Sequence, residues 1–232
     1  MRIGGLQKTT LLDFPGKISA VVFTQGCNFL CPYCHNPDLV LYGREPLAPA
    51  DVLAFLAKRR DVLQGVVISG GEPTLHDGLF SFCATLKSLG LAVKLDTNGS
   101  RPEALRQLLL ADLLDYVAMD VKAAPGRYPA ILCSQGDGEN VLRSMALLEK
   151  SPVAHEFRVP CVAPFINADS FAAILEHIAR APLFLQAARL EHVLQADFFP
   201  GQGHAMDKDA MESLREMARR KGLTCHIRNG AG

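Results

Sequence analysis

The chain has 232 residues, of which 49% are hydrophobic and 21% are charged, a balance typical of one globular domain with a substantial core. Its 24 basic residues balance 24 acidic ones, so the sequence lacks the positive excess that favours binding to nucleic acid or anionic membranes. The apolar runs are shorter than the roughly 20 residues of a membrane helix, and no secretory signal precedes them, so we expect a cytoplasmic protein.

Short apolar runs alternate with segments of helical periodicity along the chain. We predict strands around residues 20–23, 66–68, 92–95, 116–119, 157–159 and 183–185. Helical patterns cover residues 52–56, 79–86, 105–109 and 171–178, and Gly90 and Gly222 are placed as C-terminal caps. Because strands separated by helices form right-handed crossovers, this order predicts an α/β fold with a parallel sheet, an incomplete (β/α)6 barrel.

The domain organisation predicted from the sequence is simple. We expect a single domain over residues 1–232, with a core at about 18–190 and a C-terminal extension at 191–232 that contains one helix. Residues 123–138 are rich in Pro, Gly and polar residues, which predicts a long loop.

Polar motifs follow four successive predicted strands, each at the point where the strand ends. They are residues 27–36, Gly70-Gly71-Glu72-Pro73, Asp96-Thr97-Asn98-Gly99 and Asp120-Val121-Lys122. In a parallel βα barrel these ends share one face, where such folds build their active sites. We therefore predict that the four motifs contribute to one site.

Cys27, Cys31 and Cys34 lie within one short loop, which favours metal-binding thiolates over a disulfide framework. Their spacing allows three thiolates to hold an iron-sulfur cubane, whereas an electron-transfer cluster usually has four. The fourth iron would then keep an open position, which is how a metal site becomes catalytic. The alternatives are a zinc site completed by His35 or Cys225, or three buried thiols.

The other motifs are compatible with a bound amino-acid group. Gly70 and Gly71 let a ligand lie against the strand end, where backbone carbonyls and the Glu72 carboxylate can bind an ammonium group; the alternative is an ordinary tight turn. Asp96 and Asp120 end successive strands, about 4.8 Å apart if these are adjacent, so a cation between them is expected. A bound ammonium, a monovalent metal ion or Lys122 can serve, unless both aspartates only cap turns.

The cysteine loop carries a family resemblance. Residues 27–34 read CNFLCPYC and resemble the Cys-x-x-x-Cys-x-aromatic-Cys signature of the radical S-adenosylmethionine (SAM) superfamily. Residues 24–27 (TQGC) and 33–37 (YCHNP) resemble those of the activating enzymes of glycyl radical proteins. Residues 11–16 (LLDFPG), with the three later motifs, are most similar to anaerobic ribonucleoside-triphosphate reductase activating proteins. The resemblance covers roughly the first 125 residues.

The resemblance implies the site residues. Cys27, Cys31 and Cys34 would bind three irons of a [4Fe-4S] cluster, and the amine and carboxylate of SAM would chelate the fourth. The residues implied to contact SAM or a monovalent cation are Tyr33, Asn36, Gly70, Gly71, Glu72, Asp96, Asn98, Asp120, Lys122 and Arg158. Gln186 is a further candidate for a ligand contact, and the sequence does not place His204.

The resemblance also implies the reaction. A flavodoxin or ferredoxin type donor reduces the cluster, SAM is cleaved to methionine and a 5'-deoxyadenosyl radical, and this radical takes a hydrogen atom from a glycine of a partner enzyme. The expected partner is anaerobic ribonucleotide reductase. One rival function is a radical SAM enzyme acting on a small molecule, similar to 7-carboxy-7-deazaguanine synthase, and another is a non-enzymatic iron-sulfur or zinc module.

The remaining cysteines are assigned no part in this chemistry. Cys83 lies on the apolar stripe of a predicted helix, where a small buried side chain is expected. Cys133, Cys161 and Cys225 receive no role. The segment between Asn36 and Ser69 has no cysteine-rich insert, so no auxiliary cluster is expected.

Overall fold

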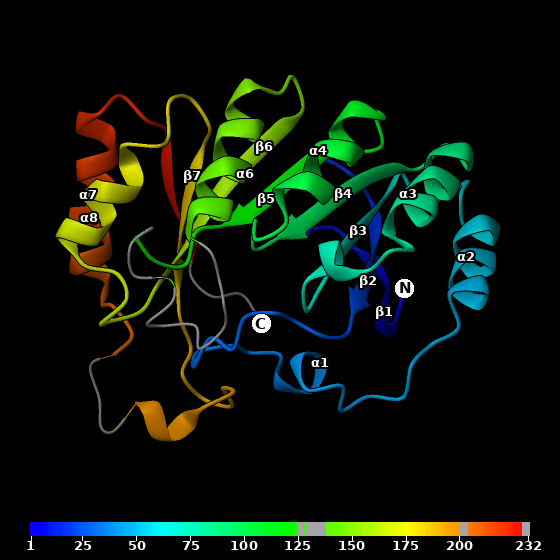
Figure 1. Ribbon diagram of the computed structural model, residues 1–232, viewed down its shortest axis with the longest axis horizontal. Coiled ribbons are helices and arrows are strands. Elements are labelled where there is room, and N and C mark those ends of the chain that lie inside the picture. Colours follow the sequence, from blue (N-terminus) through cyan, green and yellow to red (C-terminus); the bar gives the residue numbers. More distant parts are fainter. Residues whose placement is uncertain (125–127, 129–137, 200–203, 229–232) are drawn as a thin grey trace. The chain divides into compact units, whose positions relative to one another are not determined.

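The computed structural model describes residues 1–124, 128, 138–199 and 204–228 (Figure 1). Its strands are β1 (Ile3–Thr10), β2 (Ser19–Thr24), β3 (Gly65–Gly70), β4 (Ala92–Thr97), β5 (Tyr116–Asp120), β6 (Ala154–Cys161), β7 (Leu183–Ala187) and β8 (Cys225–Arg228). Its α-helices are α1 (Pro37–Val40), α2 (Pro49–Lys58), α3 (Leu79–Ser88), α4 (Pro102–Leu110), α6 (Gly138–Lys150), α7 (Ala168–Leu175) and α8 (Lys208–Arg220). In the described ranges, the 3-10 helices are the short elements η1 (Pro73–Leu75) and η3 (Ala196–Phe198).

The strands follow one another in the sheet in the order of the sequence, from β1 to β8. β1 pairs with β2 in antiparallel orientation, whereas β2, β3 and β4 pair in parallel, as do β6, β7 and β8. The six predicted strands correspond to β2 through β7, which confirms the α/β fold with a parallel sheet. β1 and β8 were not predicted, because β1 contains Gly4 and Gly5 and ends in polar residues, and β8 is only four residues long.

The chain divides into two compact units. The first unit comprises Met1–Cys27, Asn36–Thr97 and Glu103–Ala118. The second unit comprises Asn28–His35, Asn98–Pro102 and Met119–Gly232. The single domain with a core at about 18–190 stays a prediction.

The parallel strands of the first unit are buried on both faces, since consecutive residues of β2 and β3 are buried. Phe14, Val21 and Val67 form a buried cluster, and Phe23, Ala92 and Tyr116 pack against it. Helix α3 buries Leu79, Phe82, Cys83 and Leu86, which confirms the predicted helix and the buried position of Cys83. Gly90 follows the end of this helix with a φ of +77°, a left-handed conformation that glycine adopts without strain.

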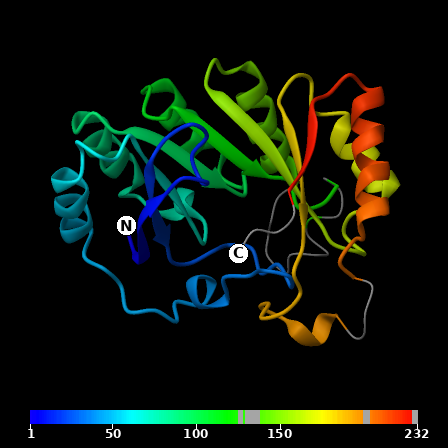
Figure 2. The same cartoon turned by 180° about the vertical axis from the view of Figure 1, so that it is seen from behind.

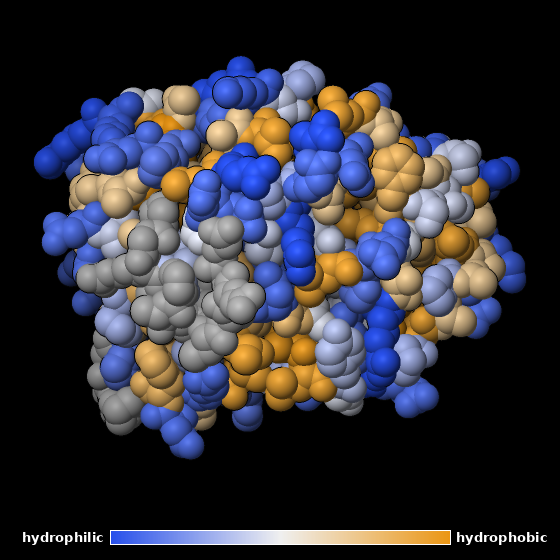
Figure 3. All heavy atoms as spheres, viewed as in Figure 1, coloured by the Kyte–Doolittle hydropathy of each residue, from blue (hydrophilic) through white to orange (hydrophobic). Residues whose placement is uncertain are grey.

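The connection from β1 to β2 contains the LLDFPG motif. The Thr10 hydroxyl donates to Asp13 at 2.5 Å, the Leu12 amide donates to Thr10 Oγ1 at 3.2 Å, and Phe14 is anchored in the core. This arrangement leaves Leu11 and Leu12 exposed, at 71% and 82%. Exposed apolar residues are common on protein surfaces, and Figure 3 shows hydrophobic side chains interspersed with hydrophilic ones on the face it views.

The second unit contains β6, β7 and β8 with their helices. Figures 1 and 2 both show α7 and α8 beside β7 and β8. From Leu183 to Gln186, the residues of β7 alternate between buried and partly exposed. Helix α7 confirms the predicted helix at 171–178, although it ends at Leu175. Helix α8 lies after residue 190, and the C-terminal extension at 191–232 stays a prediction. Most of the predicted loop at 123–138 lies outside the described residues, and so does Cys133. Among the described helices, none combines the length and hydropathy needed to span a bilayer.

Candidate functional site

The predicted site residues fall in both compact units. The first unit contains Cys27, Asn36, Gly70, Gly71, Glu72 and Asp96. The second unit contains Cys31, Tyr33, Cys34, Asn98, Asp120, Lys122 and Arg158.

In the first unit, the glycine motif lies directly against the segment that precedes Cys27. The Gly71 amide donates to the Thr24 carbonyl at 2.9 Å, and the Glu72 amide donates to the Gly26 carbonyl at 2.8 Å. Gly70 has a φ of +110°, and a Cβ on Gly71 would lie 2.1 Å from the Gly26 oxygen. The two glycines are therefore required by the close approach of two backbone segments, which an ordinary tight turn would not demand.

The Glu72 carboxylate is buried and accepts hydrogen bonds from within the first unit. Its Oε1 atom accepts from the Thr74 amide at 3.0 Å, from the Thr74 hydroxyl, and from the Thr97 hydroxyl at 2.8 Å. This carboxylate therefore caps η1 and connects the glycine motif to the end of β4. A contact of Glu72 with the SAM amine stays a prediction. Asn36 is exposed and occupies the N-cap position immediately before helix α1.

Asp96 has a cation beside it that was not predicted from the sequence. Lys94, two residues earlier on β4, is fully buried, and its ammonium group forms an ion pair with Asp96 Oδ1. The Lys94 Nζ atom also lies 6.0 Å from the centroid of the Tyr116 ring. The signal was present in the sequence, because residues two apart on a strand share one face. A lysine between Val93 and Leu95 is otherwise unexpected in a buried strand.

In the second unit, the cysteine loop is fastened to the residues that follow β4. Asn28 donates to the Ser100 hydroxyl at 2.9 Å, and Asn98 donates to Asn28 Oδ1 at 3.2 Å. The Ser100 amide in turn donates to Asn98 Oδ1 at 2.9 Å. The predicted residue Asn98 therefore supports the cysteine loop through Asn28, and no spacing in the sequence links these positions.

Aromatic and backbone contacts fix the second half of the same loop. The Tyr33 ring is buried, with its centroid 5.3 Å from that of Phe165, and its hydroxyl donates to the Lys122 carbonyl at 3.4 Å. The amides of Leu194 and Gln195 donate to the carbonyls of Cys34 and Pro32, at 3.0 and 3.1 Å. Residues beyond 190 therefore hold the cysteine loop, a contribution that the sequence did not predict.

Charged groups surround Cys31. Lys122 Nζ lies 2.8 Å from Asp120 Oδ2, so one candidate cation of the sequence analysis is paired with its aspartate. Burial raises the pKa of the Cys31 thiol to about 11, although the Lys122 charge opposes this rise. Burial is the strongest single influence on Lys122 and disfavours its charged form. The negative charges of Asp120, Cys31 and Tyr33 together outweigh burial and hold the Lys122 pKa well above its usual value. A lysine that stays charged favours the thiolate that a metal requires.

Arg158 belongs to a cluster of charges on β6 and β8. The buried carboxylate of Glu156 accepts hydrogen bonds from Arg158 Nε at 2.6 Å and from Arg228 Nη1 at 2.9 Å. The Arg228 guanidinium lies 3.6 Å from the centroid of the Phe184 ring, and Gln186 is its register partner on β7. Arg228 was missed because β8 was missed.

The cysteines provide a donor set that fits an iron-sulfur cluster. Cys31 and Cys34 are free thiols, and the Cys34 amide donates to the Cys31 carbonyl at 2.9 Å in a tight turn. Within the described part of the chain, no three His, Cys, Asp or Glu side chains converge on one point as the ligands of a single metal ion do. The thiolates of a cubane each bind a different iron, so a cluster does not require such convergence.

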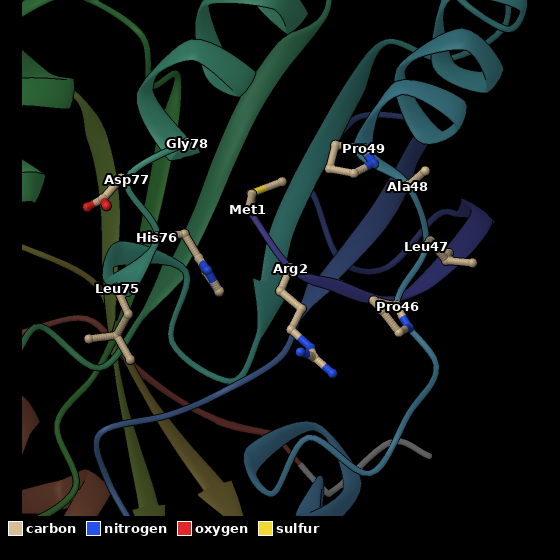
Figure 4. A pocket seen from close by; sticks show the side chains of 10 residues that line it. All are labelled: Met1, Arg2, Pro46, Leu47, Ala48, Pro49, Leu75, His76, Asp77 and Gly78. Carbon is tan, nitrogen blue, oxygen red and sulfur yellow. The ribbon is translucent and has the colours of Figure 1, made fainter.

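A cavity of about 660 Å³ lies elsewhere in the first unit (Figure 4). It is lined by residues 1–2, 46–49 and 75–78, and Arg2 and His76 point toward the same space. None of the predicted cofactor residues lines this cavity. His204, which the sequence left unplaced, lies in the second unit, where its carbonyl accepts from the Ala163 amide at 2.8 Å.

Known proteins resemble this chain in sequence. A protein of Methanocaldococcus jannaschii, provisionally named a glycyl-radical enzyme activating enzyme, is 33% identical over 189 residues, 78% of this chain and 77% of that protein. The pyruvate formate-lyase-activating enzyme of Listeria monocytogenes is 33% identical over 52% of this chain and 53% of its own length. The 7-carboxy-7-deazaguanine synthase of Hyperthermus butylicus is 36% identical over 50% of this chain and 48% of its own length. The chain thus spans about half the length of the last two relatives.

Solved structures resemble the fold. A radical SAM methyltransferase from Sphaerobacter thermophilus superposes on 97% of this chain and 70% of its own, with a TM-score of 0.70 and 15% identity. Residues 21–178 match the family described as the Radical SAM superfamily, a range that includes every predicted cluster and SAM residue. The chain therefore belongs to the radical SAM superfamily, a family of enzymes that bind a [4Fe-4S] cluster and SAM.

Proposed function

We propose that the chain is an activating enzyme that generates a glycyl radical on a partner enzyme. The observation that carries this proposal is the similarity to the Methanocaldococcus jannaschii protein, which extends over about three quarters of both chains. The similarity to a pyruvate formate-lyase-activating enzyme supports the same class of reaction.

In this proposal, Cys27, Cys31 and Cys34 hold the cluster. The SAM contacts are assigned to Tyr33, Asn36, Gly70, Gly71, Glu72, Asp96, Asn98, Asp120, Lys122 and Arg158. When bound, the cluster and SAM supply the radical that removes a hydrogen atom from the substrate. Lys122 favours the thiolate of Cys31 by its charge, and burial of Cys31 keeps water away from that sulfur. The glycine motif fixes the backbone that leads into Cys27.

The finer assignments rest on the LLDFPG motif and the three motifs at the strand ends. The partner is an anaerobic ribonucleotide reductase, the electron donor is of the flavodoxin or ferredoxin type, and the protein acts in the cytoplasm. The partner presents a backbone glycine, because its α-carbon is the position from which the hydrogen atom is removed.

A second candidate function is a radical SAM reaction on a small molecule. The similarity to a 7-carboxy-7-deazaguanine synthase supports it, since that relative is 36% identical over half of this chain. The two functions share the cluster residues and differ in the molecule that loses the hydrogen atom.

The test is anaerobic reconstitution of the chain with iron and sulfide, followed by addition of SAM and dithionite. We expect release of 5'-deoxyadenosine, and an electron paramagnetic resonance doublet when the candidate reductase is added. Cys31→Ala should abolish both signals, whereas Cys83→Ala, which changes a buried thiol of α3, should keep them.

The outcomes separate the candidates. If reconstituted protein never cleaves SAM, the assignment as a radical SAM activating enzyme fails. If it cleaves SAM and consumes a deazaguanine precursor with turnover, but leaves no radical on any glycyl radical enzyme, the small-molecule function replaces the first.

A further inference from the structure

Lys94 is a buried charge inside an apolar part of the first unit. Its register partner on β3 is Val67, which belongs to the core cluster with Phe14 and Val21. A lysine in such surroundings is almost never fully buried unless its charge is paired, because the ammonium group loses its hydration. The placement therefore points to a specific use of this charge.

The partner of that charge is Asp96. Because side chains alternate along a strand, Lys94 and Asp96 project from the same face of β4, and their charged groups form an ion pair. The two ends of the pair differ in exposure, since the Lys94 side chain is buried and the Asp96 side chain is 21% exposed. The Asp96 carboxylate therefore contacts the ammonium group of the buried Lys94 and is also partly exposed to solvent.

We propose that the Lys94 ammonium group is the fixed cation of the Asp96 position and replaces a monovalent metal ion there. This inference rests on the proposed function, in which Asp96 contributes to the SAM site. A metal ion bound to Asp96 would meet the charge of Lys94 at close range, where the low dielectric of the interior strengthens repulsion. Lys94 acts as a positioning residue through Asp96, because it holds the carboxylate in one place.

Two measurements on the reconstituted protein test the proposal, each with and without SAM. The first is thallium-205 resonance during titration with Tl⁺, which reports binding of a potassium-like ion. The second is the thermal unfolding midpoint in potassium chloride and in tetramethylammonium chloride at equal ionic strength. For the wild-type chain we expect no saturable Tl⁺ binding and equal midpoints in the two salts.

The variant Lys94→Met keeps an unbranched side chain that is one atom shorter, and it removes the charge. We expect it to gain saturable Tl⁺ binding and a higher midpoint in potassium, and we expect potassium to tighten its SAM binding by about tenfold. Lys87→Met is the matched control, since Lys87 pairs with Asp115 in the same unit, at 2.8 Å and nearer the surface. This control should respond to neither ion.

Saturable Tl⁺ binding by the wild-type chain would overturn the proposal, and so would a folded Lys94→Met variant that gains no response to potassium. Lys94→Gln serves as the second variant, and if neither variant folds, the wild-type titration decides. These readouts need no turnover, so a chain that fails to cleave SAM would refute the proposed function and leave this test intact.

Discussion

Replacing Gly71 with alanine tests the close approach of the glycine motif to the segment before Cys27. The added Cβ would lie 2.1 Å from the Gly26 oxygen and 2.7 Å from its carbonyl carbon, far inside ordinary contact. Overpacking of this kind costs about 1–3 kcal/mol. Moving the backbone apart also weakens the 2.9 Å and 2.8 Å hydrogen bonds of Gly71 and Glu72, each worth about 1 kcal/mol. We therefore expect Gly71→Ala to lower the free energy of unfolding by about 3–5 kcal/mol.

Urea denaturation followed by circular dichroism measures this loss, and two other glycines calibrate it. A Cβ on Gly5 would meet Phe23 at 3.5 Å, an ordinary contact, so Gly5→Ala should change stability by less than about 0.5 kcal/mol. A Cβ on Gly90 would meet nothing within 4 Å, but its φ of +77° should cost alanine about 1–2 kcal/mol. The steric argument is wrong if Gly71→Ala is no more destabilising than Gly90→Ala.

Four further predictions concern groups outside that contact. Thr97→Val removes a donor to the buried Glu72 carboxylate and should cost about 1–3 kcal/mol in urea denaturation, so an unchanged midpoint would contradict the hydrogen bond. Glu156→Leu removes the carboxylate that two arginines share and should cost about 3 kcal/mol or more, whereas a loss below 1 kcal/mol would show the cluster to be dispensable. Burial lowers the pKa of His76, so the native state binds this proton less readily than the unfolded state. The stability that the neutral His76 contributes is fully present above a pH of about 6.5 and is lost as the pH falls through the native pKa. His76→Gln should make the free energy of unfolding fall less steeply with decreasing pH. Parallel profiles of unfolding free energy against pH for the two proteins would refute this reasoning. Burial raises the pKa of Cys83 to about 12, so iodoacetamide at about pH 8 should label it only after unfolding, and mass spectrometry of native samples checks this.

The strands that could be predicted from the sequence are those with a recognisable local pattern of apolar residues. β2 through β7 each contain an apolar run bounded by polar residues, and this pattern is local. β1 and β8 lack such a run, because Gly4, Gly5 and a polar end weaken β1 and β8 has only four residues. Their pairing depends on the neighbouring strands β2 and β7, which no local pattern reports.

The site was predictable to a similar extent. The motifs at the ends of the strands could be selected from the sequence, because parallel strands bring their C-terminal ends to one face, and their roles in binding SAM stay predictions. Asn28 was missed because its partners lie 70 and 72 residues away along the chain. Lys94 could have been found from strand alternation, since it shares a face with Asp96 and interrupts an apolar run. The burial and charged neighbours of each ionisable group, which set its pKa, could be established only from the folded structure.

The irregular pairing of β1 affects whether two molecules of this protein can associate through their sheet edges. The register of β1 with β2 shifts between Ile3 and Gly5 and again between Gln7 and Thr10. On its outer side, the Leu47 amide donates to the Ile3 carbonyl at 2.8 Å, and Lys8 stands exposed further along. A second molecule can add a strand to a straight, unpaired sheet edge. Register shifts, exposed lysines and short segments that cover the edge prevent this pairing. The first strand thereby protects the buried, apolar β2 from intermolecular pairing and aggregation.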